Sequence, residues 1–281
     1  MGVNGTNLVQ QALIKTEIAL EVRSDLILLE EPENHLSYMN TRKLIKDIQS
    51  KCDGAQIIIT THNPLIVSRL DLRNTIWISH EKYYSLEDIP PETAEYFMKT
   101  DNMQLLNYIL AQRVILVEGN SEYILLPQLV KNEFKFTLEE MHIEILSAGG
   151  ITYKHYVELS KIIKNRLLVI TDNDGDQETI DSVLVINKEY NHILIKCSPD
   201  IEEFTFEVCL FNTNESKLKT LSDIKPGTIA EYRGKPMNQN LAYMLKNKTE
   251  AALRISEEEL YKEKVLLPKY IQEGIEWLVR Q

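Results

Sequence analysis

Acidic residues follow two apolar segments of the chain at positions that suit metal-ion chemistry. Glu118 comes directly after Val114–Val117, and Asp172 follows Leu167–Ile170 by one residue. Short, wholly apolar runs are typical of strands buried in a parallel sheet. The carboxyl ends of such strands lie at one edge of the sheet, where α/β proteins bind ligands. We therefore expect the two carboxylates to lie close together.

Further carboxylates extend this pair. Asp174 lies two positions after Asp172, and an extended chain places both side chains on the same side. Glu122 lies four positions after Glu118, on the first turn of an expected helix that Ser121 could cap. Oxygen ligands without His or Cys favour Mg²⁺ or Mn²⁺. The alternatives are a plain acidic turn or a calcium loop, although the glutamate and helices of an EF-hand are misplaced.

A second group of residues suits nucleotide chemistry. Glu30 and Glu31 end the apolar run Leu26–Leu29, and His62 follows a second run, Ile57–Thr60. One such carboxylate can hold Mg²⁺, the next can orient water against a γ-phosphate, and the histidine can contact the same phosphate. Each feature alone is more typical of a solvated strand end or a structural histidine. Together, in this order and spacing, they predict half of an ATPase site.

The loop that cradles phosphates in such sites does not occur in this sequence. There is no G-x-x-x-x-G-K-[ST] motif, and the only Gly-Lys pair, Gly234-Lys235, has Ile229 where the first glycine belongs. We therefore expect negligible ATP hydrolysis by this chain alone. ATP binding would need an additional segment or a partner that supplies the loop.

The elements that position these residues alternate along the chain. Strand-like and helix-like stretches alternate over residues 26–78, with a helix near Tyr38–Lys51 and a third strand at Thr75–Ile78, and again over 114–197. This alternation predicts an α/β fold with helices covering parallel sheets. A helix is expected within the first 25 residues. Pro90-Pro91 and a helix over Glu92–Ala111 predict a connector between the two α/β segments.

The group formed by Glu30, Glu31 and His62 resembles the C-terminal half of an ABC-type ATPase. Glu30-Glu31 is similar to the Walker B end, with Glu30 in place of the usual Asp, and His62 is similar to the switch histidine. The resemblance implies that Glu31 is the catalytic carboxylate. Asn4-Gly5-Thr6-Asn7 with Gln10 resembles a degenerate signature loop.

The carboxylate group, Glu118 with Asp172-Asn173-Asp174, resembles a Toprim domain. An ABC-type ATPase followed by Toprim resembles the OLD (overcoming lysogenization defect) family, a layout that the Gabija anti-phage nuclease shares. The resemblance covers about residues 1–255. It implies a partial ATPase domain, a helical connector, a Toprim domain and a helical C-terminal region, at residues 1–85, 86–111, 112–215 and 216–281.

The resemblance also implies a metal-dependent DNA endonuclease of anti-phage defence. Its metal ligands would be five acidic residues: Glu118, Glu122, Asp172, Asp174 and Glu207. Its catalytic residues would be Glu118, Asp172, Asp174 and a lysine near the scissile phosphate, Lys248. Surface positions are the alternative for Glu207 and Lys248. An RNA-processing or primase-like Toprim protein and a non-catalytic scaffold subunit are the alternative functions.

Composition limits the partners. The 281 residues include 42 acidic and 31 basic residues, a formal charge of −11, which argues against a general electrostatic wrap on nucleic acid. The segment Lys217–Arg254 holds eight basic and three acidic residues, which suits either a phosphate-facing patch or a solvated surface. Three cysteines without C-x-x-C spacing argue against a disulfide framework and a cysteine zinc site.

The expected setting is cytoplasmic. No apolar run approaches the roughly 18 residues that span a bilayer, and no signal-like segment occurs at the start of the sequence. Because ABC-type sites form between two protomers, we expect a homo-oligomer or a complex with a partner subunit.

Overall fold

The computed structural model describes residues 26–51, 54–78, 83–99, 104–149, 153–222, 230–232 and 234–280. The chain divides into two compact units, Met1–Leu106 and Asn107–Gln281, and each is described by itself. The expected N-terminal helix, the signature-like segment Asn4–Asn7 and Cys52 lie outside the described residues.

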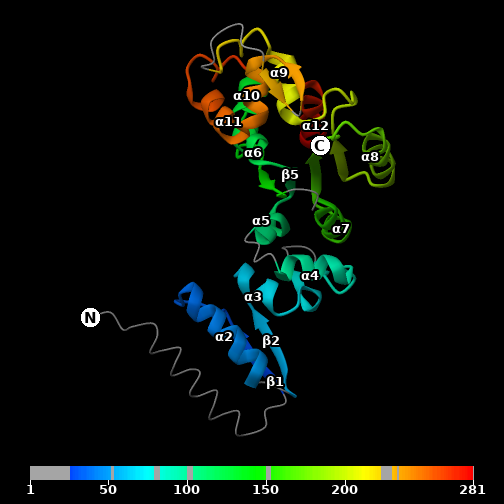
Figure 1. Ribbon diagram of the computed structural model, residues 1–281. Helices are drawn as coiled ribbons and strands as arrows, with labels where there is room; N and C mark the ends of the chain where they lie inside the picture. Colours follow the sequence, from blue (N-terminus) through cyan, green and yellow to red (C-terminus); the bar gives the residue numbers. More distant parts are fainter. Residues whose placement is uncertain are drawn as a thin grey trace, which may run out of the picture. The chain divides into compact units, whose positions relative to one another are not determined.

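The first unit contains a two-stranded parallel sheet (Figure 1). Its strands, β1 (Leu26–Glu30) and β2 (Gln56–Thr60), pair so that Glu30 lies opposite Thr60. They are joined by helix α2 (Tyr38–Lys51), and α3 (Pro64–Arg69) follows β2. A small core of Ile45, Leu65 and Ile66 holds the two helices together.

Burial on both sheet faces, expected for these apolar strands, is not found. Side chains alternate between exposed and half-buried positions along β1 and β2. Leu28 is 67% exposed and Ile58 is 48% exposed. Among the described residues this sheet has two strands, and none of those residues buries the face that carries Leu28 and Ile58.

The prediction that Thr75–Ile78 joins the parallel sheet is wrong. After the short 3₁₀ helix η1 (Leu72–Asn74), strand β3 (Ile76–Ile78) pairs antiparallel with β4 (Tyr83–Ser85). A partner only a few residues further along the chain closes a shorter loop than a crossover to β2 would. The expected connector helix corresponds to two described helices, α4 (Pro91–Lys99) and α5 (Gln104–Leu110).

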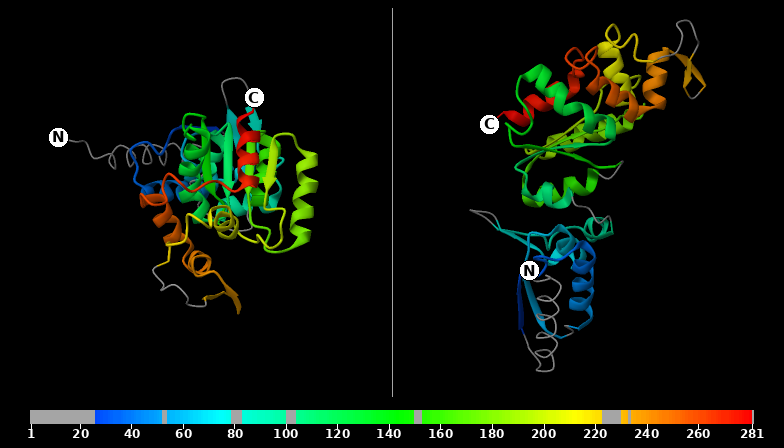
Figure 2. Two further views of the ribbon diagram at one scale, coloured as in Figure 1. Left: turned by 90° about the horizontal axis from the view of Figure 1, so that it is seen from above. Right: turned by 90° about the vertical axis from the view of Figure 1, so that its left-hand side faces the viewer.

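The second unit is built on a four-stranded parallel sheet with the order β6-β5-β7-β8. The strands are β5 (Arg113–Val117), β6 (Ile143–Ser147), β7 (Arg166–Ile170) and β8 (Ile193–Lys196). Helices α6 (Asn120–Phe134), α7 (Tyr153–Ile163) and α8 (Gln177–Glu189) connect them in turn. The right-hand view of Figure 2 shows α6 and α7 on opposite faces of the sheet. The predicted α/β class is confirmed.

The C-terminal segment packs onto this sheet. Its elements are α9 (Phe206–Asn214), β9 (Ala230–Tyr232), β10 (Lys235–Met237), α10 (Gln239–Lys246), α11 (Lys248–Glu257) and α12 (Lys269–Val279). One core cluster joins Ile115 and Leu168 of the strands to Ala251 of α11 and Ile271 of α12. The C-terminal helices therefore belong to the same hydrophobic core as the sheet. None of the described helices is both long and apolar enough to cross a membrane.

Candidate active site

The strand order places the two predicted carboxylates at a topological switch point. β5 and β7 are neighbours, whereas β6 lies on the far side of β5. The connections that leave β5 and enter β7 run over opposite faces of the sheet, the arrangement at which open α/β sheets typically bind ligands. Glu118 follows β5 and Asp172 follows β7 by one residue.

Direct hydrogen bonds join the two strand ends. The Thr171 hydroxyl donates to Oε2 of Glu118 at 2.8 Å. The backbone N–H of Asp172 donates to the same oxygen at 3.2 Å. On its other side, Asp172 accepts a 2.8 Å hydrogen bond at Oδ1 from the backbone N–H of Phe206. The beginning of α9 is thereby tied to the end of β7.

Glu122 lies on the first turn of α6, as the spacing predicted, and its side chain is only 4% exposed. The N-cap is Gly119 rather than Ser121, which lies buried inside α6. A Cβ atom on Gly119 would lie 2.9 Å from Oε2 of Glu122. The absence of a side chain at Gly119 therefore leaves room for the Glu122 carboxylate to fold back over the turn.

Two residues from distant parts of the sequence join the same cluster. Glu207, on the first turn of α9, is 3% exposed. Lys248 begins α11, and its Nζ lies 2.8 Å from Oε2 of Glu207. A cation at a helix N-terminus is disfavoured by the helix dipole, and the ion pair with Glu207 offsets that cost. The Lys248 side chain remains 45% exposed, so its ammonium is still accessible.

The electrostatics of this carboxylate cluster show a shortage of positive charge. Burial, followed by the charges of Asp172 and Glu207, raises the pKa of Glu122 to about 8. Burial and the Glu118 charge raise the pKa of Asp172 to about 7. For Lys248, burial is the largest effect and lowers the pKa, but the charge and hydrogen bond of Glu207 together with the charges of Asp172 and Glu122 leave the pKa raised overall. One ammonium does not neutralise this group of carboxylates.

Asp174 is not drawn into the cluster. The chain is not extended as predicted, because Asp174 has φ 54° and begins a tight turn. Its side chain is exposed, and its backbone N–H donates to the Phe204 carbonyl at 3.2 Å. Asn173 is fully buried instead, and its amide donates to the carbonyl oxygens of Ser198 and Asp200. The buried Asn173 therefore shapes the loop that carries both aspartates.

The donor set fits a divalent cation, although the cluster is not a ready-made coordination shell. Among the described residues, no three His, Cys, Asp or Glu side chains are arranged as a metal site. Carboxylate oxygens are nevertheless the ligands that Mg²⁺ and Mn²⁺ prefer. Besides burial, the charges of neighbouring carboxylates contribute to the raised pKa values of Glu122 and Asp172, so an added cation would relieve that repulsion.

In the first unit, Glu31 and His62 come into contact. Glu31 follows β1 and its Oε1 lies 3.3 Å from Nδ1 of His62. The Asn34 amide donates to its other oxygen at 2.7 Å. The Asn34 hydrogen bond has the largest effect and lowers the pKa of Glu31. Burial has a smaller, opposite effect, and the contact with His62 lowers the pKa further. Glu30 ends β1 opposite Thr60.

The sequence patterns did not identify a further acidic residue near Glu31 and His62. Glu33 is 6% exposed and accepts a hydrogen bond from the Thr61 hydroxyl. The Thr61 oxygen in turn accepts from the backbone N–H of Asn63, the N-cap of α3. Glu33 thus links the turn after β1 to the turn after β2, next to Glu31 and His62. Its place in Glu30-Glu31-Pro32-Glu33 is the only sequence signal that could have identified it.

Basic residues of the predicted C-terminal patch are only partly described. Lys219 and Lys246 are exposed, whereas Lys225, Arg233 and the Lys235 side chain lie outside the described part. Arg254 pairs with Glu258 at 2.8 Å.

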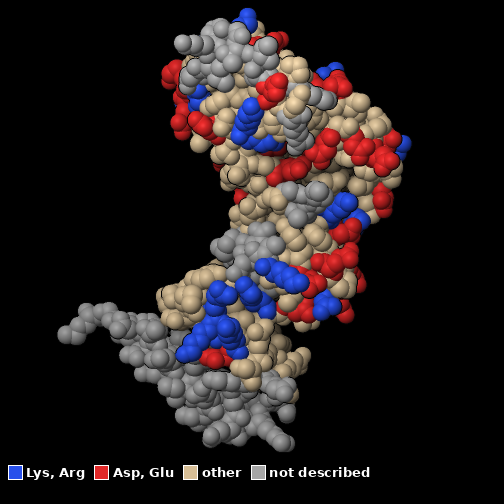
Figure 3. All heavy atoms as spheres, viewed as in Figure 1, with Lys and Arg blue, Asp and Glu red and all other residues tan. Residues whose placement is uncertain are grey.

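Figure 3 also shows Lys and Arg side chains gathered on the first unit. Helix α2 of that unit carries Arg42, Lys43 and Lys46.

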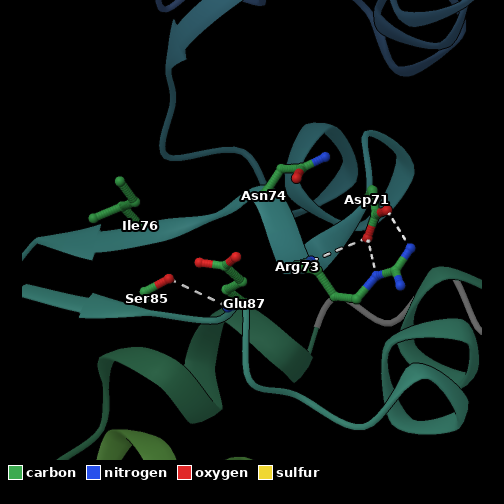
Figure 4. Close-up of a pocket in the computed structure, with 6 residues that line it drawn as sticks. All are labelled: Asp71, Arg73, Asn74, Ile76, Ser85 and Glu87. Carbon is green, nitrogen blue, oxygen red and sulfur yellow. Dashed lines mark hydrogen bonds and ion pairs between the residues drawn. The ribbon is translucent and has the colours of Figure 1, made fainter.

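A shallow pocket of about 450 Å³ lies in the first unit beside the β3–β4 hairpin (Figure 4). Its lining includes Arg73, which is held by Asp71 at 2.8 Å, and Glu87, whose backbone N–H bonds Ser85. None of the predicted site residues lines it. The pocket therefore has no connection with the predicted chemistry.

Family models match two segments of the chain. The model described as "Overcoming lysogenization defect protein-like, TOPRIM domain" matches residues 109–174. The model described as "AAA domain, putative AbiEii toxin, Type IV TA system" matches residues 12–68. The TOPRIM match includes the predicted carboxylates from Glu118 to Asp174, and the AAA match includes Glu30, Glu31 and His62. Glu207 and Lys248 lie outside both matches.

One curated protein and two solved structures are similar to this chain. Endonuclease GajA of Bacillus cereus (strain VD045) is 25% identical over 224 residues, which are 73% of this chain and 36% of GajA. The chain thus spans about a third of the length of that relative. The C-terminal regions of the OLD proteins of Burkholderia pseudomallei and Xanthomonas campestris pv. campestris each have a TM-score of 0.38 at 16% identity. Each match covers 60% of this chain, and 98% and 95% of the respective structures.

At this TM-score the two structures add no weight to the relationship. The two family models and the curated relative carry it, and they confirm the resemblance predicted from the sequence. Along the chain, the match to the AAA model precedes the match to the OLD-like TOPRIM model, which is the order that the sequence analysis predicted.

Proposed function

We propose that this chain is a DNA endonuclease that depends on Mg²⁺ or Mn²⁺. The observation that carries the proposal is the hydrogen-bonded junction of Glu118 and Asp172 at the switch point between β5 and β7. The relationship to an endonuclease supports it. The resemblance of the domain order to the Gabija layout favours a role in anti-phage defence.

The proposed metal ligands are the predicted acidic residues. Glu118, Glu122, Asp172 and Glu207 surround the strand ends, and Asp174 would approach from the exposed side of the loop. A bound cation would supply a water of lowered pKa and positive charge to stabilise the phosphate. The chain's own contribution is to hold these carboxylates in place and to keep Glu122 and Glu207 buried.

Lys248 would act on the phosphate from the other side of the cluster. Its ammonium is held by Glu207 yet half exposed, so it can meet an entering phosphodiester oxygen. Fixed positive charge that faces developing negative charge lowers the barrier of phosphoryl chemistry. We therefore place Glu118, Asp172, Asp174 and Lys248 in the catalytic set.

The first unit would contribute only part of a nucleotide site. Glu30, Glu31 and His62 supply the carboxylates and the histidine, and the phosphate loop would have to come from an additional segment or partner. We propose that DNA is the substrate of the second unit and that the chain works in the cytoplasm as a homo-oligomer or with a partner subunit.

The test is cleavage of supercoiled plasmid by the purified chain. We expect nicking or degradation with Mg²⁺ or Mn²⁺ and none with EDTA. Asp172→Asn should lower the rate by at least about 100-fold, because it removes one negative oxygen from the cluster. Without metal its melting temperature should be unchanged or slightly higher, because like charges repel in this cluster. The matched control is Asp181→Asn on the exposed part of α8.

Undiminished cleavage by Asp172→Asn would contradict the proposed site. Cleavage of RNA but not DNA under the same conditions would favour an RNA-processing protein. The absence of any metal-dependent cleavage would favour a scaffold subunit.

A further inference from the structure

We infer that Thr171 is a positioning residue that orients Glu118 so that its Oε1, rather than Oε2, faces the cation. The inference rests on the proposed function, because it concerns how that metal site is held together. It assigns no direct contact between Thr171 and substrate or metal.

The first support is that both donors to Glu118 reach the same oxygen. The Thr171 hydroxyl lies 2.8 Å from Oε2, and the Asp172 backbone N–H lies 3.2 Å from it. These two hydrogen bonds use both lone pairs of that oxygen. Oε1 is the oxygen of Glu118 that these donors leave available.

The second support is that the sheet fixes Thr171 itself. Thr171 is 6% exposed, and its backbone N–H donates to the Lys196 carbonyl of β8 at 3.0 Å. The bond to β8 therefore fixes the backbone of Thr171, from which the hydroxyl reaches Glu118. Since a hydroxyl has one proton to give, its donation to Glu118 commits that proton.

The third support is that Asp172 is held in a similar way. Its Oδ1 accepts from the Phe206 backbone N–H at 2.8 Å, which leaves Oδ2 available. Each strand end thus anchors one oxygen of its carboxylate and presents the other. Of the three donors, only the Thr171 hydroxyl belongs to a side chain, so it alone can be removed by substitution without changing the backbone.

Substitutions at Thr171 can separate the hydroxyl from the shape of the residue. Thr171→Val keeps the branched shape but removes the donor, whereas Thr171→Ser keeps the donor and removes a methyl group. Loss of a group that orients a metal ligand typically weakens metal binding or activity by about 10–100-fold. A merely structural role would be disturbed by both changes or by neither.

The experiment titrates the full chain with Mn²⁺ alone. Binding is measured by calorimetry and by the loss of the paramagnetic resonance signal of free Mn²⁺. We expect Thr171→Val to raise the dissociation constant by about 10-fold or more. Thr171→Ser should bind Mn²⁺ nearly as well as the natural chain. The melting temperature of each metal-free variant shows whether it folds, and Thr171→Ala replaces the Val variant if that one does not.

Glu118→Gln separates the two ways in which this inference could fail. If the natural chain binds Mn²⁺, Glu118→Gln loses it and Thr171→Val does not, the inference is wrong while the proposed metal site stands. Equal losses in Thr171→Val and Thr171→Ser would also overturn the positioning role. If the natural chain binds no Mn²⁺, the proposed function and the inference both fail.

Discussion

At the residue scale, the buried carboxyl group of Glu122 couples folding stability to pH. Burial, followed by the charges of Asp172 and Glu207, raises its pKa from 4.5 to about 8. Between these two pH values the folded chain keeps a proton that the unfolded chain has released. The free energy of unfolding of the metal-free protein should therefore fall as pH rises through this window.

Glu122→Gln should remove the part of the pH dependence of the unfolding free energy that Glu122 contributes. We expect the variant to be more stable than the natural chain near pH 8 in EDTA, with the difference shrinking toward pH 4.5. Urea unfolding at a series of pH values measures the difference in the free energy of unfolding between the variant and the natural chain. Glu259→Gln, at an exposed position, is the matched control. Parallel pH curves for Glu122→Gln and the natural chain would show that Glu122 is not held protonated.

Lys248 allows a second prediction at this scale. If its ammonium acts on the reacting phosphate, Lys248→Ala should lower the single-turnover cleavage rate by about 100-fold with nearly normal DNA binding. Excess DNA should not restore the rate. Lys246→Ala is the control, because Lys246 is exposed and lies two residues earlier. A variant at Lys248 that loses only affinity would make this residue an ordinary phosphate contact.

At the element scale, the last helix is an integral part of the sheet's cover. A Cβ atom on Gly274 of α12 would lie 2.9 Å from Cδ1 and 3.1 Å from Cδ2 of Leu168. Leu168 is fully buried in β7 and cannot swing into solvent. The glycine therefore sets how closely α12 approaches β7, the strand that precedes Asp172.

Gly274→Val should overpack this contact. We expect a loss of about 1–3 kcal/mol in the free energy of unfolding, measured by urea denaturation. Glu276→Val, on the exposed side of the same helix, should cost less than about 1 kcal/mol. Equal effects of the two substitutions would mean that α12 can shift away from β7.

At the scale of the whole molecule, the first prediction concerns ATP. Glu31 and His62 form a contact, but the sequence contains no phosphate-cradling loop to complete the site. We expect negligible phosphate release from ATP by this chain alone, with no difference between the natural chain and Glu31→Gln. Brisk hydrolysis that Glu31→Gln abolishes would reveal a phosphate-binding surface elsewhere in the chain.

The second prediction concerns association. Leu28 and Ile58 are exposed on one face of the β1–β2 sheet, and exposed apolar faces of this kind favour contacts between chains. We expect light scattering at micromolar concentration to show an oligomer, and Leu28→Lys to weaken it. Ser50→Lys on α2 is the control for added charge. A monodisperse monomer of the natural chain would contradict this prediction.

The sequence by itself determined the type and approximate limits of most described elements. The apolar runs at Val114–Val117 and Leu167–Ile170 became β5 and β7, and the helix expected over Tyr38–Lys51 has these bounds in the structure. Such patterns are local, because the period of a strand or helix is written in neighbouring residues. The position of an acidic residue directly after a buried strand is likewise a local property.

Only the tertiary structure decided which strand ends and helix ends meet. Adjacent pairing of β5 and β7 brings Thr171 to Glu118, and the shared core brings Glu207 and Lys248 to the same place. Local pattern also failed where the turn at Asp174 directs its side chain to solvent and where β3 pairs with β4. Strand order and helix docking depend on contacts between residues far apart in the chain, and no local period encodes those contacts.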